Sequence, residues 1–265
     1  MHELAEKYLR KEALPLLFCP GCGNGQVLNA TVRAIDELKV RDDLAAVSGI
    51  GCSSWIPVYL DIDVLHTLHG RALAYAQGLK LSRPDKKVIV FTGDGDCGGI
   101  GGNHLIHAAR RNIDITVVMI NNYIYGMTGG QKAPTTPYRS KTKTSPYGND
   151  ENPFDVSKVV MAAGGTYVAR WTTNQPVQIQ KSIQKAITHK GFSFLEIMTQ
   201  CPVQTGKYIF KNQDPWETMQ WYKDRSATKA EDIEKGSDQF LLGEFVEDVE
   251  EEFCERIARE RDGLC

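Results

Sequence analysis

The chain has 265 residues, 42% of them hydrophobic, which is enough for one large domain or for a main domain with an appendage. With 31 basic and 33 acidic residues, its net charge of −2 gives no electrostatic reason to expect binding to nucleic acid or to an anionic membrane surface. No apolar run reaches the roughly 18 residues of a membrane-spanning helix, and the charged N-terminal stretch lacks the apolar centre of a secretion signal, so we expect a cytoplasmic protein.

In chain order, the first half alternates between helical spacing and short apolar runs. Helices are predicted over 1–15, 25–40, 71–82 and 102–112, and strands over 44–52, 63–70, 86–96 and 114–122. A polar loop rich in Gly, Pro and Thr follows at 126–153, and loops of this length are usually functional or mobile.

The second half continues the alternation and then loses it. A helix, a turn and a strand are predicted within 155–171, a helix over 175–191 and a strand over 192–199. The pattern weakens after Cys201, and a charged amphipathic helix is predicted over 243–263.

This alternation predicts an α/β fold, with a mostly parallel sheet, helices on both faces and a C-terminal helical extension. We expect residues 1–204 to form the main domain and residues 205–265 to form an extension that contacts a partner. In such sheets, ligands bind at the carboxyl ends of the strands.

Two polar motifs follow neighbouring strands at that edge. Gly93-Asp94-Gly95-Asp96 ends one strand, and Asn121-Asn122 ends the next. The glycines fit a dinucleotide fingerprint, but a carboxylate beside a diphosphate is repulsive unless a cation lies between them. Mg²⁺ prefers hard oxygen ligands and tolerates diphosphate oxygens. Asp94, the Asn122 side chain and the backbone carbonyl of Ile124 would provide three of them, and the motif pair resembles the thiamine diphosphate motif.

The seven cysteines indicate a second site. Cys19 and Cys22 form a C-x-x-C at the start of a helix, and Cys52 and Cys201 each follow a predicted strand. In a cytosolic chain, four such cysteines indicate a metal site rather than disulfides, and spacing alone favours zinc and an iron–sulfur cluster equally, each above a thioredoxin-like pair. The remaining cysteines, Cys97, Cys254 and Cys265, are interpreted as bystanders.

Taken together, these segments make the chain similar to the beta subunits of the 2-oxoacid:ferredoxin oxidoreductases. The matching segments, in order, are FCPGCGNG, SGIGCSSW, HTLHGRALAYAQGLKL, VIVFTGDGD, GGNHLIHAARRNIDITVVMINNYIYGMTGGQ, PTTP and CPV, and they span residues 18 to about 203. Among the family, they look most like the 2-oxoglutarate enzymes, although the pyruvate and branched-chain enzymes share much of the pattern. One departure is Cys97-Gly98-Gly99, where the family often has apolar residues.

The resemblance implies the thiamine diphosphate-binding fold and three cofactors: thiamine diphosphate, Mg²⁺ and one [4Fe–4S] cluster. It implies cluster ligands at Cys19, Cys22, Cys52 and Cys201, and Mg²⁺ at Asp94 and Asn122. The implied reaction is coenzyme A-dependent oxidative decarboxylation of a 2-oxoacid, or its reverse, with electrons passed to ferredoxin. Because no glutamate of this chain is suitably placed to activate thiamine, an alpha subunit is expected to supply one in an α2β2-type assembly.

Further residues are predicted to contact the cofactor or the substrate. His69, rather than His66, is expected to reach the diphosphate or the substrate carboxylate, and Thr128 to touch a phosphate, which makes these two the candidate catalytic residues. Lys132 is expected to attract an anionic substrate or coenzyme A. The full predicted cofactor set is Ile50, Gly51, Cys52, Ser53, Ser54, His69, Gly93, Asp94, Gly95, Asp96, Asn122, Ile124, Gly126, Met127 and Thr128. Rival interpretations are a non-redox thiamine enzyme with a structural zinc, and a non-enzymatic zinc-binding assembly subunit.

Overall fold

The structure, a computed structural model, describes residues 2–235 and 237–262 around one seven-stranded sheet. The strand order is β11-β7-β8-β4-β3-β1-β2, and every neighbouring pair is parallel except β11 with β7. The strands are β1 (Leu44–Ser48), β2 (Asp63–His66), β3 (Lys87–Gly93), β4 (Thr116–Asn121), β7 (Tyr167–Thr172), β8 (Ser193–Met198) and β11 (Gly243–Glu247). This confirms the predicted mostly parallel sheet.

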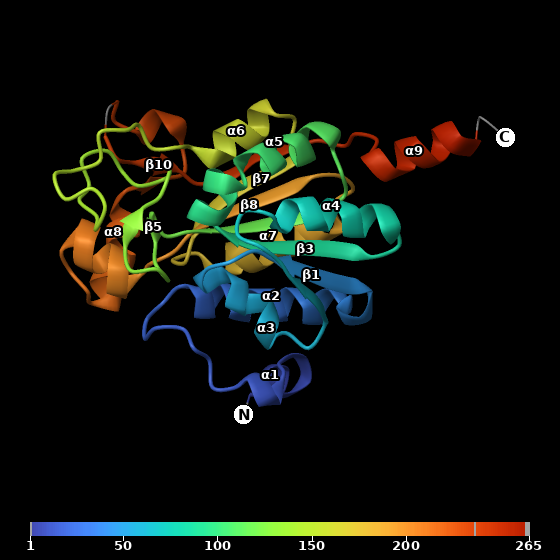
Figure 1. The fold of residues 1–265 in the computed structure, drawn as a ribbon, viewed down its shortest axis with the longest axis horizontal. Coiled ribbons are helices and arrows are strands. Elements are labelled where there is room, and N and C mark those ends of the chain that lie inside the picture. Colours follow the sequence, from blue (N-terminus) through green and yellow to red (C-terminus); the bar gives the residue numbers. More distant parts are fainter. Residues whose placement is uncertain (1, 236, 263–265) are drawn as a thin grey trace.

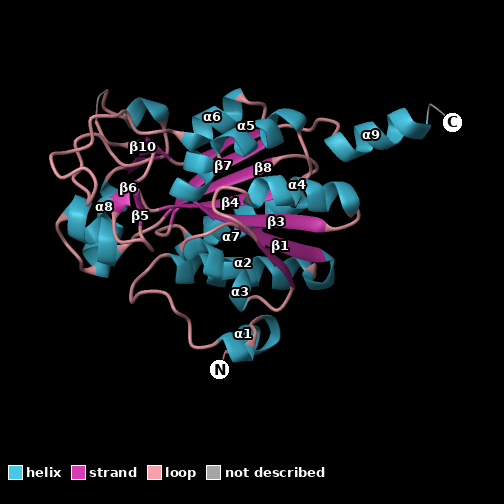
Figure 2. Ribbon diagram, viewed as in Figure 1, coloured by secondary structure: helices cyan, strands magenta, loops and turns pink. Residues whose placement is uncertain are grey.

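Helices cover both faces of the sheet, as Figures 1 and 2 show. One face carries α1 (Glu3–Tyr8), α2 (Asn24–Leu38), α3 (Trp55–Tyr59) and α7 (Pro176–Thr188), and the other carries α4 (Ala72–Ser82), α5 (Gly102–Arg111) and α6 (Val156–Ala162). Two short strand pairs lie beside the sheet: β5 (Ile124–Tyr125) with β6 (Gln131–Lys132), and β9 (Ser226–Ala227) with β10 (Phe240–Leu241).

The central strands are apolar throughout because both of their faces are buried. On β4, Val118 and Ile120 pack into the core beneath α2 and α7, whereas Val117 and Met119 pack into the core beneath α4 and α5. Successive side chains of a strand point to opposite faces, so a strand between two helical layers needs a continuous apolar run.

The N-terminal helix is shorter than predicted. The stretch 1–15 contains α1, which ends at Tyr8, and a separate 3₁₀ turn at Lys11–Ala13. Leu9 pairs with Leu60 in an isolated bridge, and Arg10 donates its backbone N–H to the carbonyl of Tyr59. This tertiary pairing replaces the helical hydrogen bonds of the second turn.

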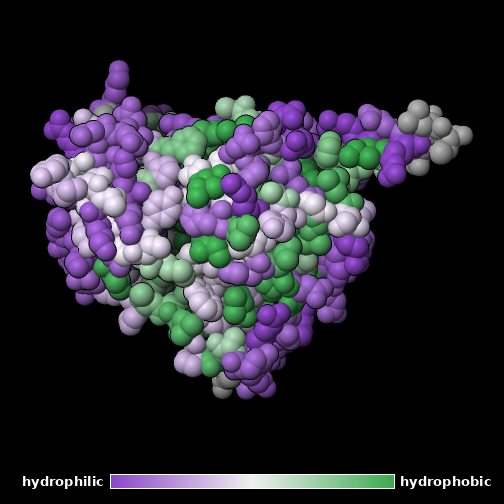
Figure 3. Space-filling model, viewed as in Figure 1, coloured by the Kyte–Doolittle hydropathy of each residue, from purple (hydrophilic) through white to green (hydrophobic). Residues whose placement is uncertain are grey.

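The prediction of one helix over 243–263 was wrong for its first part. Residues Gly243–Glu247 form strand β11, which pairs antiparallel with β7, and the helix α9 covers only Phe253–Asp262. Phe245 and Val246 pack against the core on the α4 side, which a purely solvent-facing helix would not do. The extension also contains α8 (Pro215–Asp224), and α9 projects from the body with a mainly hydrophilic surface (Figure 3).

The topology brings four loops to one edge of the sheet. Strands β8, β4, β3 and β1 are consecutive neighbours and run parallel, so their carboxyl ends lie side by side. These ends lead to Cys201, Asn122, Asp94 and Cys52, respectively.

Within residues 2–235 and 237–262, none of the helices combines the length and the apolar composition that a membrane span requires.

A buried ionic network joins β7, β8 and α6. Glu196, 2% exposed, accepts hydrogen bonds from Arg170 Nε at 2.8 Å and Asn121 Nδ2 at 2.7 Å, and another from the hydroxyl of Ser157. Arg170 also donates to Asp155. Glu196 is therefore a structural partner of Arg170.

We predict that Glu196→Leu lowers the free energy of unfolding by about 3–5 kcal/mol, because it removes the buried partner of a guanidinium. Glu255→Leu, which removes an exposed ion pair with Lys190, should cost less than about 1 kcal/mol. Urea unfolding followed by circular dichroism measures both, and equal losses in the two variants would contradict the assignment.

Candidate functional site

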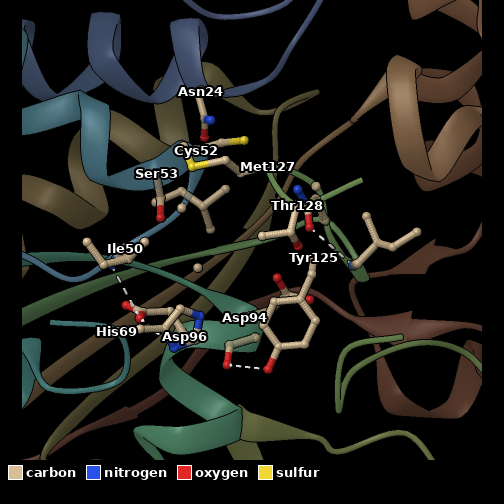
Figure 4. A pocket seen from close by; sticks show the side chains of 17 residues that line it. Asn24, Ile50, Cys52, Ser53, His69, Asp94, Asp96, Tyr125, Met127 and Thr128 are labelled. Carbon is tan, nitrogen blue, oxygen red and sulfur yellow. Dashed lines mark hydrogen bonds and ion pairs between the residues drawn. The ribbon is translucent and has the colours of Figure 1, made fainter. Parts of the chain in front are cut away.

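A cleft with about 520 Å³ of empty space, which opens to solvent, lies where β1, β3 and β4 end. Figure 4 shows side chains from the ends of these strands, from the β5–β6 hairpin and from the start of α2 pointing toward one another around this cleft. Asp94 and Asp96 lie at one end in this view, and Asn24 and Cys52 lie at the other. The cleft therefore joins the loop after β3 to the cysteine-bearing loop after β1.

Asp94 is a buried carboxylate at the base of this cleft. It is 2% exposed and accepts a hydrogen bond from the hydroxyl of Thr135. Burial raises the pKa of Asp94 to about 7, although the bond from Thr135 and a bond from the backbone of Gly95 oppose the shift. Because no lysine or arginine lines the cleft among the described residues, a bound cation would supply the missing charge compensation.

Asp96 has a different role from Asp94, since its oxygens hold the surrounding loops together. It accepts hydrogen bonds from the backbone N–H of Gly70 at 2.6 Å and from the hydroxyl of Thr92 at 2.7 Å, with a longer one from Ile50 N–H at 3.4 Å. A Cβ at Gly49 would lie 2.1 Å from Asp96 Oδ2, so only glycine fits there. Asp96 thus holds the segments of Ile50 and Gly70 in place, and its oxygens are already occupied by hydrogen bonds.

Asn122 and Ile124 reach the cleft through a backbone kink. Tyr123 between them has φ of +65°, which reverses the chain direction locally. Asn122 Oδ1 accepts a hydrogen bond of 3.2 Å from Ile124 N–H, and Thr205 donates to the Asn122 carbonyl. Asp94, Asn122 and Ile124, the predicted magnesium ligands, therefore line one cleft.

The four predicted cluster cysteines are also neighbours. Burial, together with the nearby Cys201, Cys52 and Cys19, raises the pKa of Cys22 to about 12. Burial, together with Cys201, Cys19 and Asp94, raises the pKa of Cys52 to about 11. Thiolates gathered in one place need a metal to compensate their charge.

Gly126 separates two of these sulfurs. A Cβ at this position would lie 3.8 Å from both Cys52 Sγ and Cys201 Sγ, so the glycine leaves the space between them open. The turn of Cys19 and Cys22 is brought close because Gly23 N–H donates to the carbonyl of Gln200 at 3.1 Å. Each loop is thus tied to the next by backbone contacts.

The two metal interpretations call for different spacings of the four sulfurs. One zinc ion would draw four sulfurs to within about 3.8 Å of one another, given a Zn–S bond of about 2.3 Å. No group of three or more His, Cys, Asp or Glu side chains in residues 2–235 and 237–262 is arranged to hold a single ion. A four-iron cluster places each thiolate on a different iron atom and so needs wider spacing.

The structure brings nearly all of the predicted cofactor residues to the cleft. Those that line it are Ile50, Gly51, Cys52, Ser53, His69, Gly93, Asp94, Gly95, Asp96, Asn122, Ile124, Gly126, Met127 and Thr128. Ser54 is the exception, because its hydroxyl donates to the carbonyl of Gly51 at 2.6 Å and it does not line the cleft. His66 also lies outside the lining, where Nδ1 pairs with the hydroxyl of Ser48 at 2.9 Å.

The two side chains predicted to be catalytic differ in their availability. His69 Nδ1 is buried, lies 3.4 Å from Asp96 Oδ1 and makes no hydrogen bond with the described residues. Thr128, in contrast, directs its hydroxyl to Gln131 Oε1 at 2.7 Å. Only His69 therefore presents an unused polar group, and Lys132 is engaged in an ion pair with Glu151 at 2.7 Å.

Sequence reasoning missed three lining residues: Asn24, Ile120 and Tyr125. Asn24 is 2% exposed, and its Oδ1 has no hydrogen-bond partner in the described chain. Tyr125 donates its hydroxyl to the Gly95 carbonyl at 2.9 Å, and its ring lies where a Cβ of Gly95 would be. The sequence offered one indication of Asn24, because it lies two residues after Cys22 of the C-x-x-C motif.

The other cysteines lie apart from this group. Cys97 is buried in the core on the α4 side, and Cys254 lies beside Glu252 at the start of α9. Cys265 lies outside the described residues. All six described cysteines are free thiols.

Known proteins agree with this geometry. The family described as thiamine pyrophosphate enzyme, C-terminal TPP binding domain, matches residues 49–197, more than half of the chain. The "2-oxoglutarate synthase subunit KorB" of Methanocaldococcus jannaschii is 52% identical over 258 residues, covering 96% of this chain and 95% of the relative. The subunit of the same name from Archaeoglobus fulgidus is 50% identical, covering 96% and 93%.

A solved structure extends this agreement to three dimensions. The 2-oxoglutarate:ferredoxin oxidoreductase from Magnetococcus marinus, described with 2-oxoglutarate, coenzyme A and succinyl-CoA bound, superimposes with a TM-score of 0.88 at 34% identity, covering 98% of this chain and 90% of that one. A fold shared over nearly the whole length, together with half-identical relatives, leaves one assignment. The chain belongs to the thiamine diphosphate-dependent 2-oxoacid:ferredoxin oxidoreductases, as a beta subunit of the 2-oxoglutarate synthase (KorB) family.

Proposed function

We propose that this chain, together with an alpha subunit, catalyses coenzyme A-dependent oxidative decarboxylation of 2-oxoglutarate to succinyl-CoA and CO₂. The two electrons released would leave through a [4Fe–4S] cluster to ferredoxin, and the reverse reaction is reductive carboxylation. The observation that carries the proposal is that Asp94, Asn122 and Cys52 line one cleft, with Cys201 close to Cys52 across Gly126. This arrangement supports a diphosphate–metal site next to four thiols.

The cleft fits thiamine diphosphate with Mg²⁺. Asp94, Asn122 and the Ile124 carbonyl would hold the ion, because they supply hard oxygens at a buried point without a cationic side chain. The unpartnered Oδ1 of Asn24 lies at the end of the cleft away from Asp94, where it would bind the coenzyme. When bound, thiamine diphosphate supplies a nucleophilic carbon that adds to the ketone of the substrate.

The cysteine loops fit a cluster beside that coenzyme. Cys52 lines the cleft and also belongs to the four-thiol group, so one residue would touch both cofactor sites. When bound, the cluster supplies a one-electron acceptor. This chain would hold the coenzyme and the cluster at a fixed distance from each other. Asp96 contributes by accepting hydrogen bonds from the backbone N–H groups of Gly70 and Ile50, which fixes the loops after β1 and β3.

The cleft also indicates what the partner subunit must provide. Among the described residues that line it, the acidic side chains are Asp94 and Asp96, and there is no glutamate to activate the aminopyrimidine ring. Leu68 and Ile100, 65% and 53% exposed, lie on the two segments next to His69 that meet at Gly70. We infer that an alpha subunit covers this side, in an α2β2-type assembly.

The free thiols favour a reducing compartment, so we propose a cytoplasmic enzyme.

The non-redox alternative with a structural zinc is less well supported, because the solved structure that superimposes on nearly the whole chain is a ferredoxin oxidoreductase. A pyruvate or branched-chain 2-oxoacid substrate remains the alternative within the family. The relatives that match over nearly the full chain carry the 2-oxoglutarate name, which favours 2-oxoglutarate.

We predict that the complex co-purified with its alpha subunit reduces a viologen dye anaerobically, with coenzyme A and 2-oxoglutarate as the best substrate. Pyruvate and 2-oxoisovalerate should react more slowly. The beta chain alone should be inactive, because its cleft lacks the activating carboxylate. Turnover by the isolated chain, or a preference for pyruvate, would contradict the proposal.

We predict that Cys52→Ser abolishes the cluster, because serine cannot replace a thiolate that lies at the contact between two sites. Iron and acid-labile sulfide per protomer, and the electron paramagnetic resonance signal of the reduced complex, should fall to background. Cys254→Ser, at the start of α9, provides the matched control and should retain both. Loss of iron from both variants would argue for general instability.

We predict that apo-protein binds Mg²⁺ with thiamine diphosphate about tenfold more weakly at pH 6 than at pH 8. The pKa of Asp94 is raised to about 7 by burial, so acid protonates the carboxylate that must ligate the ion, and affinity rises as pH increases through 7. Titration calorimetry measures this dependence. Asp94→Asn should bind weakly at both pH values, and an unchanged pH profile in this variant would refute the role of Asp94.

A further inference from the structure

The proposed substrate differs from pyruvate by a second carboxylate, and recognition of that group calls for a cation. The cleft itself has an acidic base, with Asp94 and Asp96, and among the described lining residues it has no lysine or arginine. A cation of this chain must therefore come from the rim of the cleft. The segments that form the rim are the β5–β6 hairpin and the long loop that follows it.

The hairpin turns tightly at the mouth of the cleft. Gly129 N–H donates to the Gly126 carbonyl at 3.2 Å, and Gly130 N–H donates to the Tyr125 carbonyl at 2.9 Å. Both glycines have positive φ, +111° at Gly129 and +96° at Gly130, which the turn requires. Met127 at the tip is 47% exposed while also lining the cleft, so the tip marks its solvent side.

The long loop returns across this hairpin and is fixed to it at Lys143 and at the next residue, Thr144. Lys143 N–H donates to the Gly130 carbonyl at 2.8 Å, and Lys132 N–H donates to the Thr144 hydroxyl at 2.9 Å. The Nζ of Lys143 lies 3.5 Å from the point where a Cβ of Gly129 would be. The ammonium group therefore lies over the backbone next to Thr128, a lining residue.

Lys132 belongs to the hairpin and Lys143 is hydrogen-bonded to it through its backbone, but their ammonium groups differ in availability. Lys132 forms an ion pair with Glu151 at 2.7 Å. Lys143 has an exposed side chain, and its ammonium forms no ion pair or hydrogen bond with any residue that the structure describes. A solvated ammonium keeps its charge and can meet a carboxylate at the mouth with little reorganisation.

We propose that Lys143 is a specificity-determining residue that binds the distal carboxylate of a dicarboxylic 2-oxoacid at the mouth of the cleft. The inference rests on the proposed function, because it assigns the 2-oxo end of the substrate to the interior beside the coenzyme. The distal carboxylate then points toward the hairpin tip and the ammonium above Gly129. Gly129 contributes by having no side chain that would occupy this position.

The test compares Lys143→Met with the wild-type complex, using 2-oxoglutarate and 2-oxobutyrate, which lacks the distal carboxylate. We expect kcat/KM for 2-oxoglutarate to fall about tenfold through KM, with kcat nearly unchanged, since one solvent-exposed charge-assisted contact is lost. The values for 2-oxobutyrate should not change. Lys143→Arg, which keeps the charge, should restore most of the 2-oxoglutarate value.

Lys141→Met is the matched control, because it removes the same charge from the same loop at a residue that, in the part of the chain described, has no hydrogen bond to the hairpin. The inhibition constant of glutarate should rise in Lys143→Met and stay constant in Lys141→Met, while iron and thiamine contents stay at the wild-type level in both. Equal effects on both substrates, or equal effects of both variants, would overturn the inference.

The two proposals fail in different ways. A wild-type complex without preference for 2-oxoglutarate over 2-oxobutyrate overturns the proposed substrate, and the inference with it. A strong wild-type preference that survives unchanged in Lys143→Met overturns the role of Lys143 alone.

Discussion

The parallel pairing of β8, β4, β3 and β1 is the constraint on which the site depends. Parallel neighbouring strands end at the same edge of the sheet, so four loops that are far apart in the sequence become neighbours in space. Across that edge they bring Cys201, Asn122, Asp94 and Cys52 into one neighbourhood. The cores on both faces of the sheet fix these strand ends, and the buried Arg170–Glu196 pair ties β7 to β8 beside them.

The electrostatics of this edge favour cations that the chain does not supply itself. The pKa of Asp94 and those of Cys22 and Cys52 are raised chiefly by burial, and neighbouring negative charges add to the shifts. Each group would be most stable as an anion only with a metal beside it. Asp96 shows the contrasting solution, since Gly70, Ile50 and Thr92 satisfy its oxygens with hydrogen bonds. Two carboxylates two residues apart thus have different roles.

Function is divided between this chain and the surfaces around it. The interior of the cleft provides oxygens, sulfurs and an unpartnered amide at Asn24, all suited to cofactors. The groups that would act on the substrate are sparse there, which is consistent with an active site completed at a subunit contact. The hairpin rim with Lys143 is the place where this chain itself presents an available positive charge close to the cleft. In this proposal, residues in the interior of the cleft bind the cofactors, and Lys143 at its rim selects the substrate.

The sequence by itself determined the order of the main helices and strands up to β8, without α3, β5 and β6, together with the mostly parallel sheet and the two motif sets, because these depend on local periodicity and on chemically distinctive residues. Of the two histidines, His69, which it favoured, lines the cleft, and His66 does not. Only the tertiary structure decided that 243–247 is an edge strand, since pairing with β7 overrides its helical spacing. Likewise, it turned Ser54 toward Gly51 and placed Asn24, Tyr125 and the ammonium of Lys143 around the cleft. The contacts of Tyr125 and Lys143 arise between segments distant in the chain, and no local pattern encodes them.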